Sequence, residues 1–126
     1  MKRPKIHTIE GACVVCALHY AVGIDEFAVL RACKSYGFTE KRGMEDTEWR
    51  NAAGLLGLRL RLEPTEPIEL RKVIKKYPKG LFLLGTFDHL FVLDHGILYD
   101  PRGPKTGGLR RTIKQIWRVV GGSDKI

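Results

Sequence analysis

The segment from Cys13 to Val22, CVVCALHYAV, most strongly limits how this chain can fold. Every residue in it except His19 is apolar, small or aromatic. A surface helix needs a polar stripe along one side, and this segment has none. The pattern therefore predicts a helix buried in the middle of a domain, ended by Gly23.

Two further helices are expected before the first strand. One covers Asp25 to Tyr36, capped by Asp25, and the other runs from about Asp46 to Leu56. The expected inward-facing side chains of the first are Phe27, Val29, Leu30 and Cys33. The sequence LRLRLE, residues 58–63, alternates with period two and predicts a strand. A basic helix is expected to follow, starting at Thr65 and Pro67.

The second half of the chain predicts mostly strands. The continuous apolar run GLFLLGTF, residues 80–87, is typical of a strand covered on both faces. Residues 89–100 predict a β-hairpin with His95 and Gly96 at the turn. Residues 112–120 fit either a helix or a strand. Helices first and antiparallel strands second predict the α+β class, and the length of 126 residues predicts one domain spanning 1–126.

Composition limits the compartment and the class of protein. The chain is 44% hydrophobic and 29% charged, as in ordinary globular proteins, and no apolar run reaches the ~18–20 residues of a membrane span. The start MKRPKIHTIE lacks the apolar core of a signal peptide. Three cysteines are an odd number, so a disulfide framework is not expected. These features predict a cytoplasmic protein with no membrane partner, and they leave its oligomeric state open.

The net charge of +8 has two interpretations. It fits binding to nucleic acid or another acidic partner, and it also fits a lysine-rich surface. In residues 67–80 an apolar stripe (Leu70, Val73, Ile74, Tyr77) alternates with a cationic one (Lys72, Lys75, Lys76, Lys79), as on a surface helix. A second basic patch runs from Arg102 to Lys125. Neither patch interleaves aromatic residues as base-stacking surfaces do, so nucleic-acid binding is the secondary interpretation.

The predicted hairpin brings a histidine and a carboxylate together. A two-residue loop pairs Asp94 with Ile97, Val92 with Tyr99, and Phe91 with Asp100. His89 shares a face with Phe91, so His89 and Asp100 become diagonal neighbours whose side chains can meet. A carboxylate that accepts from one imidazole nitrogen fixes the tautomer and leaves the other nitrogen for proton transfer. The alternative is that Asp100 only begins the turn at Pro101.

The CVVC motif also has several interpretations. Cys13 lies at the predicted start of the buried helix, where free N–H groups and the helix dipole favour a thiolate. A redox pair normally follows a strand, and here only KIHTI precedes it. A zinc site could use Cys13, Cys16, His19 and Cys33, but no second closely spaced pair is present. Cys16 and Cys33 are better explained as buried hydrophobes, His19 as a core or helix-face residue and His95 as a turn residue. What remains is a Cys13, His89 and Asp100 set suited to nucleophilic catalysis.

These motifs, in this order, resemble those of compact papain-like cysteine peptidases. The resembling segments are CVVCALHYAVGI near the N-terminus and DHLFVLDHGILYDP near the C-terminus. Similar proteins include the bacteriocin-leader-processing peptidase domains and small phage and bacterial proteins of this fold. The resemblance implies a papain-like fold, in which an N-terminal central helix packs on a small antiparallel sheet.

The resemblance also implies roles for residues. Cys13 would be the nucleophile, His89 the general base and acid, and Asp100 the orienting carboxylate. The substrate would be a peptide or protein, attacked through an acyl-thioester, with no metal or other cofactor. The oxyanion would be held by the Cys13 N–H and by a side chain six residues upstream, which is His7 here.

Three positions depart from the family pattern. His7 stands where the family commonly has glutamine, Ala12 where relatives often have aspartate, and Cys16 where one group has arginine. Loss of one oxyanion donor typically costs ~10²–10³ in rate. The alternative to a small intracellular peptidase is therefore a papain-fold module without catalysis, which binds nucleic acid or a phage or host protein through its basic surface.

Overall fold

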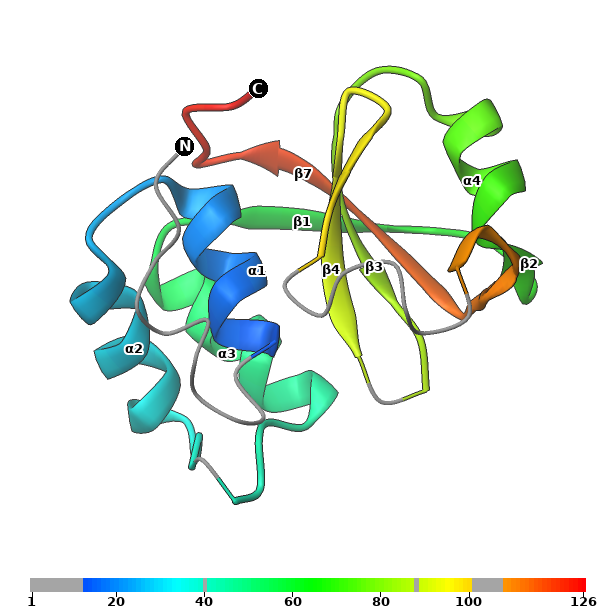
Figure 1. Cartoon of the computed structure of the whole chain (residues 1–126). Helices are drawn as coiled ribbons and strands as arrows, with labels where there is room; N and C mark the ends of the chain where they lie inside the picture. The colour runs from blue at the N-terminus through cyan, green and yellow to red at the C-terminus, as the bar shows by residue number, and fades with distance from the viewer. Residues whose placement is uncertain (1–12, 40, 88, 101–107) are drawn as a thin grey trace.

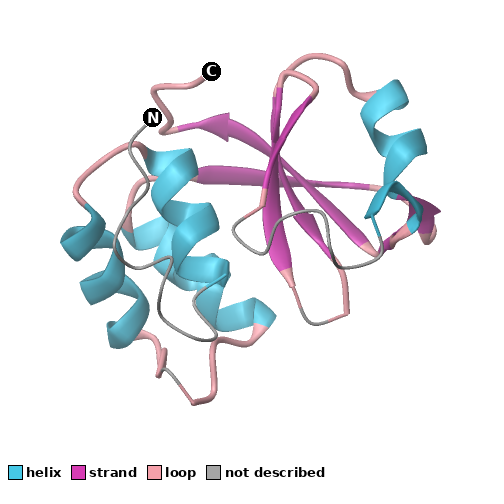
Figure 2. Ribbon diagram, in the orientation of Figure 1, coloured by secondary structure: helices cyan, strands magenta, loops and turns pink. Residues whose placement is uncertain are grey.

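A five-stranded antiparallel sheet separates two groups of helices in the computed structural model, which describes residues 13–39, 41–87, 89–100 and 108–126 (Figure 1). The α-helices in these ranges are α1 (Cys13–Val22), α2 (Glu26–Ser35), α3 (Asp46–Leu55) and α4 (Leu70–Lys76). The strands of the main sheet are β1 (Arg59–Glu63), β3 (Leu81–Gly85), β4 (Leu90–Asp94), β5 (Ile97–Tyr99) and β7 (Gln115–Gly121). Figure 2 shows helices packed beside strands, and in the chain α1, α2 and α3 come first and the strands mostly after them, which confirms the α+β class.

The order of strands in the main sheet is β1-β7-β3-β4-β5, and every pairing is antiparallel. The C-terminal strand β7 therefore lies between β1 and β3. A second, two-stranded sheet pairs β2 (Ile68–Glu69) with β6 (Thr112–Ile113). Residues 112–120, which fitted either a helix or a strand, form β6 and β7.

Each face of the main sheet contributes to its own hydrophobic core. Alternate residues of β3, β4 and β7 pack with α1, α2 and α3 on one face, among them Leu83, Val92 and Trp117. The intervening residues pack with α4 on the other face, among them Phe82 and Phe91. All five residues of β3 are buried, as expected for a continuous apolar strand.

The helix α1 has the predicted bounds and is almost entirely buried. Its residues from Val14 to Leu18 are at most 7% exposed, and Gly23 follows its end with a positive φ of 77°. The Asp25 side chain caps α2 by accepting from the Phe27 N–H at 3.1 Å, as predicted. Within the described ranges, no helix has both the length and the apolar character needed to cross a membrane.

Two details of the predicted helices were wrong. Phe27 was expected to face inward but is 54% exposed, because the buried side of α2 carries Val29, Ala32 and Cys33. The basic helix was expected to begin at Thr65 and Pro67, but α4 begins at Leu70. Residues 68–69 instead pair with β6, a partner more than forty positions away that local sequence signals cannot reveal.

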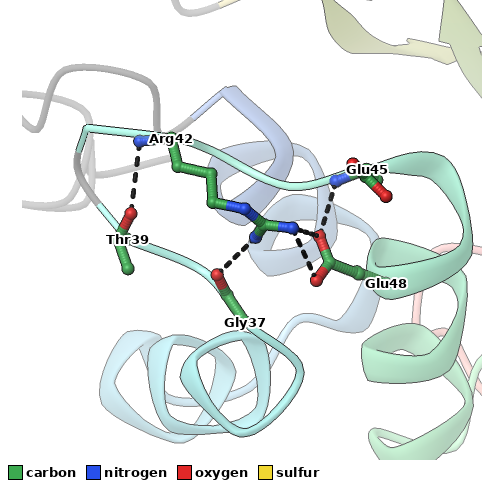
Figure 3. A network of polar contacts seen from close by, with 5 residues as sticks. All are labelled: Gly37, Thr39, Arg42, Glu45 and Glu48. Carbon is green, nitrogen blue, oxygen red and sulfur yellow. Dashed lines mark hydrogen bonds and ion pairs between the residues drawn. The ribbon is translucent and has the colours of Figure 1, made fainter.

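The connection between α2 and α3 is organised by Arg42 (Figure 3). Its guanidinium donates to the Gly37 carbonyl at 2.7 Å and to the Glu48 carboxylate at 2.9 Å. Glu48 also accepts from the Glu45 N–H at 2.9 Å, and this backbone hydrogen bond, followed by that of Arg42, lowers the pKa of Glu48. These exposed contacts fold the connection onto the start of α3.

The β4–β5 hairpin has the predicted two-residue turn. His95 and Gly96 both have positive φ, 49° and 82°, as a type I′ turn requires. The register pairs Val92 with Tyr99 and Asp94 with Ile97, as predicted. This register brings Asp100, the residue after β5, back toward the start of β4.

We expect Gly96→Ala to lower the free energy of unfolding by about 1–2 kcal/mol, because an L side chain at this φ is strained. His95→Asn is the matched control at the other turn position, and a change of less than about 0.5 kcal/mol is expected because Asn tolerates positive φ. Urea unfolding measures both. Equal losses in the two variants would contradict this account of the turn.

Candidate catalytic site

Cys13 is the first residue of α1 and is partly exposed, whereas Val14 to Leu18 after it are buried. The apolar residues that follow Cys13 are buried in the core, and Cys13 is therefore left at the end of the helix near the surface. Peptide N–H groups in the first turn of a helix have no intrahelical acceptor, and they favour negative charge nearby. The thiol therefore lies where a thiolate is electrostatically favoured.

His89 lies directly before β4 and is only 7% exposed. Its carbonyl accepts from the Thr86 N–H at 2.9 Å, which closes a tight connection from β3. Its ring stacks on Phe91, with centroids 5.5 Å apart and an interplanar angle of 23°. The stacked ring is held at the point where β4 begins.

Asp100 meets His89 as the hairpin register predicted. The Nε2–H of His89 donates to Oδ1 of Asp100 at 2.7 Å, and the two side chains are only 3% and 5% exposed. A short, buried hydrogen bond of this kind fixes the imidazole orientation and assigns Nδ1 as the remaining basic atom.

Cys13, like Asp100, interacts with the His89 ring and raises its pKa. Burial lowers the pKa of His89, but hydrogen bonding and charge from Asp100 and from the Cys13 thiol outweigh it, and the net pKa is raised. Nδ1 of the ring is buried. The thiol therefore lies close enough to the ring for a proton to pass between them.

A separate polar cluster fixes the other end of α1 against the hairpin. The Tyr20 hydroxyl donates to Oδ2 of Asp94 at 2.6 Å, and the Tyr20 ring stacks on Tyr99 at 4.4 Å. Burial, followed by the Asp94 carboxylate, raises the pKa of Tyr20 to about 12. These contacts join the helix that carries Cys13 to the strands that flank His89 and Asp100.

Arg111 is a residue beside His89 and Asp100 that the sequence did not point to. Its Nη1 donates to Oδ2 of Asp100 at 2.7 Å, and its side chain is 10% exposed. Sequence reasoning counted it only as one cation of the second basic patch. The signal that could have found it is its position two residues before the buried Ile113, which places both on one face of an extended segment.

The other sequence-predicted residues do not join the site. Cys16 and Cys33 are buried at 1% and 0% exposure, and burial raises the pKa of Cys33 to about 12. His95 is the exposed turn residue that was predicted. All three cysteines are thiols. Among the described residues, no group of histidine, cysteine, aspartate and glutamate side chains could hold a metal ion.

The predicted oxyanion residue His7 lies outside the described residues, as do Ala12 and the loop that begins at Pro101. The structure therefore brings Cys13, His89 and Asp100 together, while their catalytic roles stay predictions. No significant match to this chain is found among models of protein families, curated proteins or solved structures. The resemblance to papain-like peptidases therefore stays a prediction from the sequence motifs.

We expect Asp100→Asn to lower the pKa of His89. The carboxylate that counteracts the effect of burial is then lost, and the nearby Arg111 charge is left uncompensated. An NMR titration of the imidazole measures this change. The control is Asp25→Asn, the same chemical change at a helix cap that Asn also serves. An unchanged His89 titration in folded Asp100→Asn protein would contradict the assigned hydrogen bond.

Proposed function

We propose that this chain is a small cysteine peptidase of papain-like fold, a thiol acyl hydrolase with Cys13, His89 and Asp100 as its catalytic residues. The observation that carries the proposal is the His89 ring, whose Nε2 is held by Asp100 while the Cys13 thiol acts on the same ring. Packing of the N-terminal helix α1 against β4 of the antiparallel sheet also supports it.

In the resting site, the proton of the Cys13 thiol is transferred to Nδ1 of His89. The resulting imidazolium is stabilised by Asp100 at 2.7 Å, and the thiolate by the imidazolium and by the start of α1. The raised pKa of His89 favours this charge separation. A thiolate is the nucleophilic form of cysteine, so this pair is ready to attack a carbonyl.

The reaction then follows from these positions. The Cys13 sulfur attacks the peptide carbonyl carbon, and the oxygen becomes an oxyanion near the Cys13 N–H, one of the helix N–H groups without an intrahelical acceptor. The tetrahedral adduct collapses as the imidazolium of His89 donates its proton to the leaving amine. The acyl-thioester is hydrolysed by water, from which His89 removes a proton. His7 stays the predicted second oxyanion donor.

The alternative function is a module without catalysis that binds through its basic surface. The lysines of α4, Lys72, Lys75 and Lys76, are exposed. Tyr77, the aromatic residue beside them, packs on Phe82 with centroids 4.8 Å apart, so its ring stabilises the core. The geometry of α4 is therefore that of a surface helix covering the sheet, and it does not favour nucleic-acid binding over catalysis.

Alkylation by iodoacetamide tests the proposal without knowledge of the substrate. Free cysteine has a pKa of about 8.5, so little thiolate is present at about pH 6. An activated Cys13 should react about tenfold faster than free cysteine at that pH, even after allowing for the weaker nucleophilicity of a low-pKa thiolate. Peptide mapping by mass spectrometry should find the label on Cys13 and not on the buried Cys16 and Cys33.

His89→Ala should remove this rate advantage, because the imidazolium partner of the thiolate is lost. His95→Asn, a change at the exposed turn, is the control and should react like the unaltered protein. The peptidase proposal would be wrong if Cys13 were alkylated no faster than free cysteine and His89→Ala did not change that rate. This result would favour the binding module.

Cleavage itself is tested with a peptide library derived from a whole proteome. New peptide termini should appear with the unaltered protein and be absent with Cys13→Ser, because a serine hydroxyl at this position is not ionised near neutral pH. Termini produced equally by both proteins would show that Cys13 is not the nucleophile.

A further inference from the structure

Asp100 has a nitrogen donor on each of its two carboxylate oxygens. Oδ1 accepts from Nε2 of His89, and Oδ2 accepts from Nη1 of Arg111, both at 2.7 Å. The three residues come from separate segments: His89 precedes β4, Asp100 follows β5 and Arg111 precedes β6. The carboxylate thus bridges the imidazole and a guanidinium.

This bridge is almost out of contact with water. The side chains of His89, Asp100 and Arg111 are 3%, 5% and 10% exposed. Buried charges are costly unless they are paired and hydrogen-bonded, so each member depends on the others. Removal of one partner leaves an uncompensated charge in a low-dielectric environment.

One aromatic ring supports both partners of Asp100. The His89 ring stacks on Phe91, and Cζ of Arg111 lies 4.3 Å from the centroid of the same ring. The backbone of Arg111 is fixed as well, since its carbonyl accepts from the Leu70 N–H at 2.9 Å at the start of α4. Arg111 is therefore held by contacts other than its ion pair with Asp100.

We propose that Arg111 is a positioning residue of the site formed by Cys13, His89 and Asp100. Its guanidinium fixes the rotation of the Asp100 carboxylate and keeps that carboxylate ionised, so that the carboxylate in turn orients His89. This inference rests on the proposed function, because it assigns Arg111 to the same reaction. Arg111 acts through Asp100 and does not touch the reacting atoms.

The charge of Arg111 also limits how strongly Asp100 acts on His89. An imidazolium that faces a carboxylate with no other partner holds its proton more tightly, which hinders donation of that proton to the leaving amine. The charged or titratable groups shown to act on one another here are Cys13 from α1, His89, Asp100 and Arg111. Loss of the positive charge at Arg111 should leave Asp100 uncompensated and raise the pKa of His89.

The test compares Arg111→Gln, which loses the charge but keeps an N–H donor, with Arg111→Lys, which keeps the charge but loses the planar fork. NMR titration should place the His89 midpoint at higher pH in Arg111→Gln than in the unaltered protein, with Arg111→Lys close to the unaltered value. Arg118→Gln is the matched control, because Arg118 likewise pairs with a carboxylate, Glu63, and lies 4.7 Å from the Phe82 ring. It should leave the His89 titration unchanged.

Circular dichroism identifies which variants are folded. If Arg111→Gln does not fold, the test depends on Arg111→Lys. Alkylation of Cys13 in this variant at about pH 6 should be about threefold slower or more, because the planar guanidinium that orients Asp100 is lost. An unchanged His89 midpoint in folded Arg111→Gln would overturn the proposal. Equal shifts in both folded variants would also overturn it, because they would indicate a merely structural role.

Failure of this inference is distinguishable from failure of the proposed function. Rapid, His89-dependent alkylation of Cys13 with no effect of Arg111 would remove only the role of Arg111. Slow alkylation of Cys13 in the unaltered protein would remove the peptidase proposal itself.

Discussion

The buried hydrogen bond between His89 and Asp100 is the interaction on which the account of this site depends. It joins the two ends of one hairpin, and its geometry follows from the two-residue turn at the far end of that hairpin. A slip of one residue in the register would turn Asp100 to the opposite face of the sheet. The orientation of the imidazole therefore depends on the turn residues and on the alternation of core side chains in the hairpin.

The sheet and the helix α1 place the Cys13 thiol near the His89 ring. Two cores on opposite faces hold β3 and β4 rigidly. The contact of Tyr20 with Asp94 fixes the far end of α1 to the same hairpin. Because α1 is apolar along nearly its whole length, Val14 to Leu18 are buried, and Cys13 before them lies partly exposed beside His89. Fold stability and site geometry depend on the same contacts.

The sequence predicted the parts of this structure that are set by local or short-range patterns. The bounds of α1, the cap at Asp25 and the turn at His95 and Gly96 follow from apolar runs and turn chemistry, and the meeting of His89 with Asp100 follows from period-two alternation. The pairing of residues 68–69 with β6, and the contact of Arg111 with Asp100, could not be predicted, because both depend on segments that meet only in the folded chain. The exposure of Phe27 was missed because helical periodicity fixes an apolar stripe only approximately.

The central claim is that Cys13 and His89 form a thiolate–imidazolium pair in the resting protein. The most direct measurement is the ultraviolet absorbance of the thiolate as a function of pH, taken as the difference between the unaltered protein and Cys13→Ser. The thiolate should already be present well below pH ~8.5, the range in which free cysteine ionises, and it should disappear when His89 is replaced by alanine. A Cys13 signal that appears only in the range of free cysteine, with or without His89, would contradict it.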